Sequence, residues 1–171
     1  MQLQFEEKDV GSLMLRELPY GKIFQYDSYF YMKVFEKLEG FNLKSPNGAY
    51  MCVNLKIGTL RLLPKTTRII PYIGLMSVKN IALTACDGYM LKNGNVVCLN
   101  DSAYLKTKST CTGIDHQLNS KYGLFIHLRS ATLHKFEISQ KFSVWTNCCL
   151  SKLKKDNAKN YRKRPEHTIP V

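Results

Sequence analysis

The stretch "AYMCVNLKIGTLRLLPKTTRIIPYIG" (residues 49–74) decides the fold class. In "YMCVNL", the apolar residues Met51, Val53 and Leu55 stand at every second position, and "TLRLL" continues this alternation. A two-residue period is that of a β-strand with one buried face. The intervening "KIG" is a short loop in which Gly58 can adopt a positive φ, so the two runs are predicted to form a β-hairpin. Pro64 has no N–H for a ladder and is expected to end the second strand. "TTRIIPY" then starts a third strand.

Short runs of the same kind recur along the chain and predict a mainly β fold, built as antiparallel small barrels or a sandwich. Asp-Gly, Asn-Gly and Thr-Gly turn signals separate many of them. The runs are "YFYMKVF" (29–35), "KNIALTA" (79–85), "GYML" (88–91), "NVVCLN" (95–100), "GLFIHLRS" (123–130), "LHKFEIS" (133–139) and "KFSVWTN" (141–147). The first run also fits helical spacing, through Phe30, Val34 and Leu38, but its aromatic and β-branched residues favour a strand.

The chain is predicted to contain three segments. Residues 1–74 form a small β-barrel module, and residues 75–149 form a second β module that can pack with the first as one domain. The best boundary between them is "PYIGLMS" (71–77). Residues 150–171 form a basic segment, with a poor amphipathic helix over 150–162 followed by a loose tail, "RKRPEHTIPV". An echo between "YMCVNLKIGTL" and "YMLKNGNVVCL" is too short to establish an internal repeat.

The net charge of +12 is unevenly spread and indicates a polyanionic partner. Residues 1–50 carry −1, residues 51–149 carry +8 and residues 150–171 carry +5. The alternative is that the charge serves solubility alone. The expected contact residues are Arg61, Lys65, Arg68, Lys152, Lys154, Lys155, Arg162, Lys163 and Arg164. Tyrosines interleaved with these cations suit the stacking of single-stranded bases, although tyrosine is also a common strand residue.

The N-terminal "MQLQFEEKDV" is acidic where an export signal would be basic and apolar. The chain also has no uninterrupted apolar run of about 18 residues that would span a membrane. The expected location is therefore the cytoplasm, with no membrane partner. In that compartment the six cysteines are expected to be free thiols.

A few histidines are candidates for acid–base chemistry. His116, His127, Arg129 and His134 lie within twenty residues of one another. A strand over "GLFIHLRS" would place Phe125, His127 and Arg129 on one face. An imidazole beside a guanidinium is the minimum for a metal-independent ribonuclease, but no motif fixes a second acid–base group.

The spacing of the cysteines and histidines does not predict a metal site. Cys111 and His116 stand in C-x4-H spacing, and Cys148 and Cys149 are adjacent, whereas structural zinc sites use two tight ligand pairs. No Walker, GxGxxG, HExxH or GxSxG motif is present. We therefore expect no cofactor and no metal.

Residues 15–63, "LRELPYGKIFQYDSYFYMKV…AYMCVNLKIGTLRLL", resemble small β modules of bacteriophage accessory proteins. The resemblance is carried by Leu18, Gly21, Phe24, Tyr31, Met32, Lys33, Ala49, Val53, Asn54, Leu55, Gly58 and Leu60. The segment "FEKLEGFNLKSPNG" lengthens the usual gap between the two halves of the pattern. The resemblance implies an SH3-like or small-barrel fold and a viral accessory role, with no reaction and no catalytic residues.

Three functions follow as hypotheses. The first is a phage-type accessory protein that binds and inhibits a host nucleic-acid-dependent complex, such as a defence or CRISPR-like ribonucleoprotein, without catalysis. The second is a plain RNA- or DNA-binding module. The third is a small metal-independent ribonuclease that uses His127 or His116. Only an inhibitor binds a host protein tightly without nucleic acid, and only a ribonuclease loses cleavage on a single histidine change.

Overall fold

The computed structural model describes residues 11–35, 48–78, 84–109, 121–145, 148–152 and 168–170. These residues form strands and short 3-10 turns, so the predicted mainly β fold is confirmed. The first half holds β1 (Leu13–Met14), η1 (Leu15–Glu17), β2 (Ile23–Tyr26), β3 (Tyr29–Lys33), β4 (Ala49–Asn54), β5 (Thr59–Pro64) and β6 (Arg68–Pro71), followed by β7 (Gly74–Val78). The second half holds β8 (Thr84–Asp87), η2 (Gly88–Met90), β9 (Val96–Leu99), β10 (Ser102–Ser109), β11 (Tyr122–His127), β12 (Thr132–Glu137) and β13 (Lys141–Trp145), followed by β14 (Cys148–Lys152) and β15 (Thr168–Pro170).

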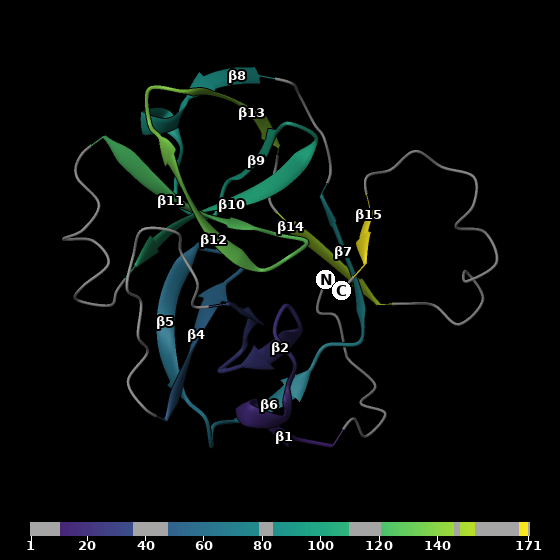
Figure 1. Cartoon of the computed structure of the whole chain (residues 1–171). Helices are drawn as coiled ribbons and strands as arrows, with labels where there is room; N and C mark the ends of the chain where they lie inside the picture. The colour runs from purple at the N-terminus through teal and green to yellow at the C-terminus, as the bar shows by residue number, and fades with distance from the viewer. Residues whose placement is uncertain are drawn as a thin grey trace.

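Most strands belong to one mixed sheet of 12 strands. Its order is β1-β6-β2-β3-β4-β5-β10-β9-β13-β8, and β11 and β12 continue from β10. β7, β14 and β15 form a second, three-stranded sheet beside it (Figure 1). The large sheet follows an open path, so the prediction of closed small barrels is wrong. Along this path β5 is the last strand from the first half, and it pairs in parallel with β10 of the second half.

The local predictions around the opening stretch are confirmed. β4 and β5 form the expected antiparallel hairpin, with Met51 opposite Leu62. Gly58 in the connecting loop has a φ of +67°, and Pro64 is the last residue of β5. The segment that also fitted a helix forms β3 in an antiparallel pair with β2.

Four local predictions are wrong or only partly met. "GYML" forms the 3-10 turn η2 instead of a strand, and within "KNIALTA" the described residues 84–85 begin β8. Residues 150–152 lie in strand β14, so no helix begins at 150. Residues 168–170 are not loose tail, because they pair with β7. Backbone hydrogen bonding to β7 outweighs the poor apolar periodicity of this segment.

The two halves of the chain are structural repeats of one unit, offset by 73 positions. In β2–β3, Ile23 pairs with Met32; in β9–β10, Val96 pairs with Leu105, and both numbers lie 73 positions further on. The same offset converts the registers of β1–β6, β3–β4, β4–β5 and β2–β6 into those of β8–β13, β10–β11, β11–β12 and β9–β13. We call residues 13–71 the first repeat and residues 86–144 the second repeat.

The turns of the two repeats also match. Asp27 and Ser28 link β2 to β3 with positive φ at both positions, and Asn100 and Asp101 do the same between β9 and β10. Positive φ at both central residues defines the type I′ hairpin turn. Among the described residues, few are identical at equivalent positions: Leu18/Leu91, Gly21/Gly94, Tyr31/Tyr104, Lys33/Lys106, Leu55/Leu128, Thr59/Thr132 and Leu60/Leu133. The sequence echo had aligned the wrong segments, since the equivalent of β4 is β11.

An approximate two-fold axis relates the repeats. The Lys108 N–H donates to the Gly58 carbonyl at 2.9 Å, and the Phe35 N–H donates to the Ala131 carbonyl at 2.9 Å. Lys108 is the equivalent of Phe35, and Ala131 is the equivalent of Gly58. Each repeat therefore contacts the other through the same two backbone groups, one N–H donor and one carbonyl acceptor. In Figure 1 the first repeat forms the lower half and the second repeat the upper half.

The largest core cluster lies between the repeats. Its fully buried members include Ile23, Met32 and Val53, together with their equivalents Val96, Leu105 and Ile126. Each repeat has a smaller cluster on its opposite face. We call that opposite face, on β2–β5 and on β9–β12, the outer face. Within the described part of the chain, no helix is both long and apolar enough to cross a membrane.

Candidate functional site

β3 presents aromatic side chains on the outer face. Its residues alternate in direction, so Tyr29, Tyr31 and Lys33 point outward while Phe30 and Met32 point to the shared core. Phe35 continues the outward set beyond the strand. Tyr29 is 44% exposed and Phe35 is 41% exposed, so both rings are open to a ligand.

Lys33, by contrast, is a structural residue. It is only 2% exposed. Its Nζ donates to the carbonyls of Leu15 at 3.0 Å and Leu18 at 2.6 Å. The same ammonium lies 3.6 Å from the ring centre of Tyr50 and 4.7 Å from that of Tyr20. Lys33 thus fixes the η1 segment and two tyrosine rings on the outer face.

Two of the predicted contact residues join these rings. The Arg61 guanidinium lies 5.9 Å from the Tyr26 ring centre and 6.0 Å from that of Tyr31, and its Nη1 donates to the Tyr31 hydroxyl at 3.4 Å. Lys65 Nζ lies 5.0 Å from the Tyr50 ring centre. These distances are in the range of cation–π contacts. The aromatic–basic surface is defined here as Tyr20, Tyr26, Tyr29, Phe35, Tyr50, Arg61 and Lys65; Tyr31, which Arg61 contacts, is buried.

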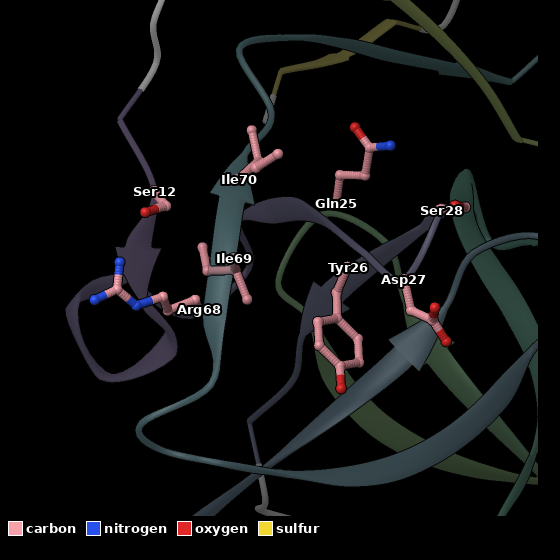
Figure 2. A pocket seen from close by; sticks show the side chains of 8 residues that line it. All are labelled: Ser12, Gln25, Tyr26, Asp27, Ser28, Arg68, Ile69 and Ile70. Atoms are coloured by element: carbon pink, nitrogen blue, oxygen red, sulfur yellow. The ribbon is translucent and has the colours of Figure 1, made fainter.

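The electrostatics of this surface favour an anion. The segment 48–78, which supplies β4, β5 and β6, contains Lys56, Arg61, Lys65 and Arg68 and no acidic residue. Arg68 stands apart from Arg61, beside a hollow of about 230 Å³. Figure 2 shows Arg68 extending toward Ser12 on one side of this hollow, while Asp27 lies at the hairpin turn on the other. Tyr26 lines the hollow and also contacts Arg61.

The second repeat carries histidines where the first carries Asn54 and Arg61. Asn54 Oδ1 accepts hydrogen bonds from the N–H groups of Lys56 (2.9 Å) and Ile57 (3.2 Å) and so caps the β4–β5 turn. His127, its equivalent, accepts at Nδ1 from the Ser130 N–H at 3.3 Å. His134 is the equivalent of Arg61. Both repeats thus have the same turn cap, but only the second repeat forms it with an imidazole.

Two hydroxyls connect the two imidazoles. His127 Nδ1 is 2.5 Å from Ser130 Oγ, Ser130 Oγ is 2.6 Å from Thr132 Oγ1, and Thr132 Oγ1 is 3.0 Å from His134 Nε2. We call these four residues the histidine chain. The two imidazole centres are 6.0 Å apart. The ring of Tyr104 contacts both, at 5.1 Å from His127 and 5.4 Å from His134.

Burial and charge keep both imidazoles neutral. Partial burial lowers the pKa of His127, and the nearby His134 and Arg129 charges lower it further. Partial burial also lowers the pKa of His134. Because the ordinary histidine pKa is about 6.5, both rings are mainly uncharged at neutral pH.

The histidine chain adjoins the aromatic–basic surface. Phe35 and Thr132 form a parallel β-bridge, and side chains of bridge-paired residues point to the same face of a sheet. The Phe35 ring, which stacks on Tyr20 at 4.5 Å, therefore shares a face with the Thr132 hydroxyl. The two features form one continuous outer face across the junction of the repeats.

The structure separates the other predicted residues from this face or does not describe them. Arg129 is wrong as a strand residue facing with Phe125 and His127, because β11 ends at His127 and Arg129 lies exposed in the following turn. Lys152, Cys148 and Cys149 belong to β14 in the smaller sheet. The predicted residues that lie outside the described part of the chain are Cys111, His116, Lys154, Lys155, Arg162, Lys163 and Arg164. Among described side chains, no group of three or more His, Cys, Asp or Glu could hold a metal ion.

Sequence reasoning missed Ser130, Thr132 and Phe35 as members of the site. The 73-residue offset, which the strand registers reveal, aligns His127 with the turn-capping Asn54 and His134 with Arg61. No protein-family model, no curated protein and no solved structure matches this chain.

Proposed function

We propose that this protein binds single-stranded nucleic acid through the aromatic–basic surface. The observation that carries the proposal is the placement of Arg61 and Lys65 against tyrosine rings, beside the exposed rings of Tyr29 and Phe35. Single strands are bound without base pairing by rings on which bases stack and by cations that neutralise the phosphates. This face supplies both.

The rings favour a single strand over a duplex. In a duplex both faces of each base are already stacked, and the bases do not reach side chains on a sheet. An unpaired base can lie on Tyr29 or on the exposed Tyr20–Phe35 pair. Base–ring stacking contributes about 1–3 kcal/mol per base.

The phage-type resemblance extends this proposal to a host complex. In that case the bound strand belongs to a host defence ribonucleoprotein, which the protein inhibits by occupying its nucleic acid. Pull-down from host lysate, with and without nuclease treatment, tests this extension. We expect a captured host complex that nuclease releases; capture that survives nuclease would show that the target is a protein surface.

The proposal is tested by fluorescence anisotropy with labelled single-stranded RNA and DNA. We expect the double change Arg61→Ala and Lys65→Ala to weaken binding at least tenfold. The matched control is Lys135→Ala with Lys141→Ala, which removes the same charge from exposed positions of the second repeat. Equal losses in the two double variants would show that net charge, and not this surface, is responsible.

A further inference from the structure

We propose that the histidine chain is a catalytic acid–base site that cleaves RNA by attack of a ribose 2′-hydroxyl on the adjacent phosphodiester. His134 is the base and His127 the acid, and Ser130 and Thr132 relay a proton between them. The inference rests on the proposed function for delivery of the strand. It goes beyond that function because it assigns a reaction and a second set of residues.

Counting hydrogens defines the states that the chain allows. It contains three hydrogen bonds: between His127 and Ser130, between Ser130 and Thr132, and between Thr132 and His134. Each hydroxyl has one hydrogen to donate, so the two hydroxyls supply two of the three hydrogens. One of the terminal nitrogens, His127 Nδ1 or His134 Nε2, must supply the third. The protonation states of the two imidazoles are therefore coupled through the chain.

The Ser130 backbone determines which terminus carries the hydrogen at rest. Its N–H donates to His127 Nδ1, so that nitrogen is unprotonated. His134 Nε2 then carries the hydrogen and donates to Thr132. The two nitrogens outside the chain follow from this assignment: a neutral His127 has a proton on Nε2, and a neutral His134 has a free lone pair on Nδ1.

The reaction balances without any further reactant. His134 Nδ1 takes the 2′-hydroxyl proton as the O2′–P bond forms. The P–O5′ bond breaks, and O5′ takes the proton from His127 Nε2, which gives a 2′,3′-cyclic phosphate and a 5′-hydroxyl. The chain hydrogens each move one place, from His134 through Thr132 and Ser130 to His127 Nδ1. Both imidazoles remain neutral and end in the opposite tautomer.

The geometry suits this transfer. Acid and base must each reach one of two oxygens on opposite sides of one phosphorus, with hydrogen bonds of about 3 Å. A separation of 6.0 Å between the ring centres leaves room for such a group. Arg129 lies two residues after His127, exposed, with its charge close enough to lower that histidine's pKa.

The fold itself does not require these histidines. At the same two positions the first repeat carries Asn54, which caps the turn equally well, and Arg61. The first repeat also has Ile57 in place of Ser130. Of the two repeats, only the second therefore has two imidazoles connected by two hydroxyls. The first repeat supplies natural replacements for a test, His127→Asn and His134→Arg.

The test uses the full chain, end-labelled single-stranded RNA, and the same oligonucleotide with 2′-deoxyribose throughout. We expect cleavage of the RNA alone, with a 2′,3′-cyclic phosphate on the product. Each of His127→Asn and His134→Arg should lower the cleavage rate about 100-fold or more, the range of lost acid–base catalysis. Binding of the deoxy oligonucleotide should be retained in both variants.

The pH profile separates a relay from two independent groups. The groups around the pair are Tyr104, Arg129 and Lys106, the last placed over the ring of Phe125, the cross-strand partner of His134. With the relay intact, the neutral pair is active, so the rate should rise with pH and then stay level. Thr132→Val breaks the chain, after which one imidazole must be charged and the other neutral. That variant should be slower, with a bell-shaped profile.

Two results would overturn the inference. One is an RNA cleavage rate no higher than that of the His127→Asn, His134→Arg double variant, while the deoxy strand still binds; the proposed function would then stand alone. The other is an identical pH profile for the wild type and Thr132→Val, which would remove the relay. Absent binding of any strand would instead contradict the proposed function.

Discussion

Lys33 and its equivalent Lys106 show how one position keeps a cation inside both repeats. Lys33 donates to two carbonyls of the η1 segment and touches two rings. Burial lowers the pKa of Lys106, whose ammonium lies over the Phe125 ring. Burial alone would predict an apolar residue at this position. Both repeats instead have a lysine there, and in the first repeat it holds the η1 segment in place.

We expect Lys33→Met to lower the free energy of unfolding by about 2–4 kcal/mol. Two buried carbonyls lose their donor, and each unsatisfied group costs about 1–3 kcal/mol. Urea unfolding followed by circular dichroism measures the change. Lys22→Met, at an exposed position before β2, is the control and should be neutral within about 0.5 kcal/mol. Equal effects of the two substitutions would contradict the anchoring role.

The two histidines also make stability depend on pH. Their pKa values are lowered in the folded state, so the unfolded chain binds more protons below its ordinary histidine pKa of about 6.5. Stability should therefore be full above that pH and fall as the pH drops through it. Urea midpoints at pH 7.5 and pH 5.5 measure this loss. His127→Asn should reduce it, and an unchanged pH dependence in that variant would contradict the lowered pKa.

At the scale of elements, the loop after β4 and the loop after β11 are equivalent but differ in packing. Gly58 has a φ of +67°, and a Cβ there would lie 2.3 Å from the Gly94 nitrogen. Ala131, its equivalent, has a φ of +55° and carries its Cβ. Its neighbour Gly21 leaves more room, since a Cβ added at Gly21 would be 3.7 Å from that of Ala131.

We therefore expect Gly58→Ala to destabilise the protein by about 2–4 kcal/mol. Left-handed backbone at a non-glycine residue costs about 1–2 kcal/mol, and overpacking adds about 1–3 kcal/mol. The matched change Ala131→Gly should alter stability by no more than about 1 kcal/mol. Thermal and urea unfolding compare the two. A tolerated Gly58→Ala would mean that the junction of the repeats is looser than its geometry indicates.

Some features of the structure could be predicted from the local chemistry of single residues, and others could not. Gly58 and Pro64 restrict their own backbones, so the hairpin and its end could be predicted. The duplication could not, because equivalent positions preserve burial and turn geometry more than identity: Phe24 corresponds to Val97, and Gly58 to Ala131. The histidine chain depends on the β11–β12 register, which alternation within one strand does not reveal.

For the whole molecule, the shared core makes the repeats depend on each other. The first repeat alone would expose Ile23, Met32 and Val53 and leave the edge of β5 without β10. The contact between the repeats is two-fold symmetric, so a second copy of the first repeat can take the place of the missing second repeat. We expect a fragment of residues 1–78 to form a homodimer that unfolds on dilution, as sedimentation and circular dichroism would show. A folded monomeric fragment would contradict the shared core.

The most direct test of nucleic-acid binding is the salt dependence of affinity for a single-stranded RNA. Each phosphate contact on a single strand contributes a slope of about −0.7 in log affinity against log salt. With Arg61 and Lys65 in contact, the slope should be about −1.4. The Arg61→Ala, Lys65→Ala variant should flatten it by about 1.4, while the Lys135→Ala, Lys141→Ala control keeps it. A slope near zero, or one that is the same in both double variants, would contradict binding through the aromatic–basic surface.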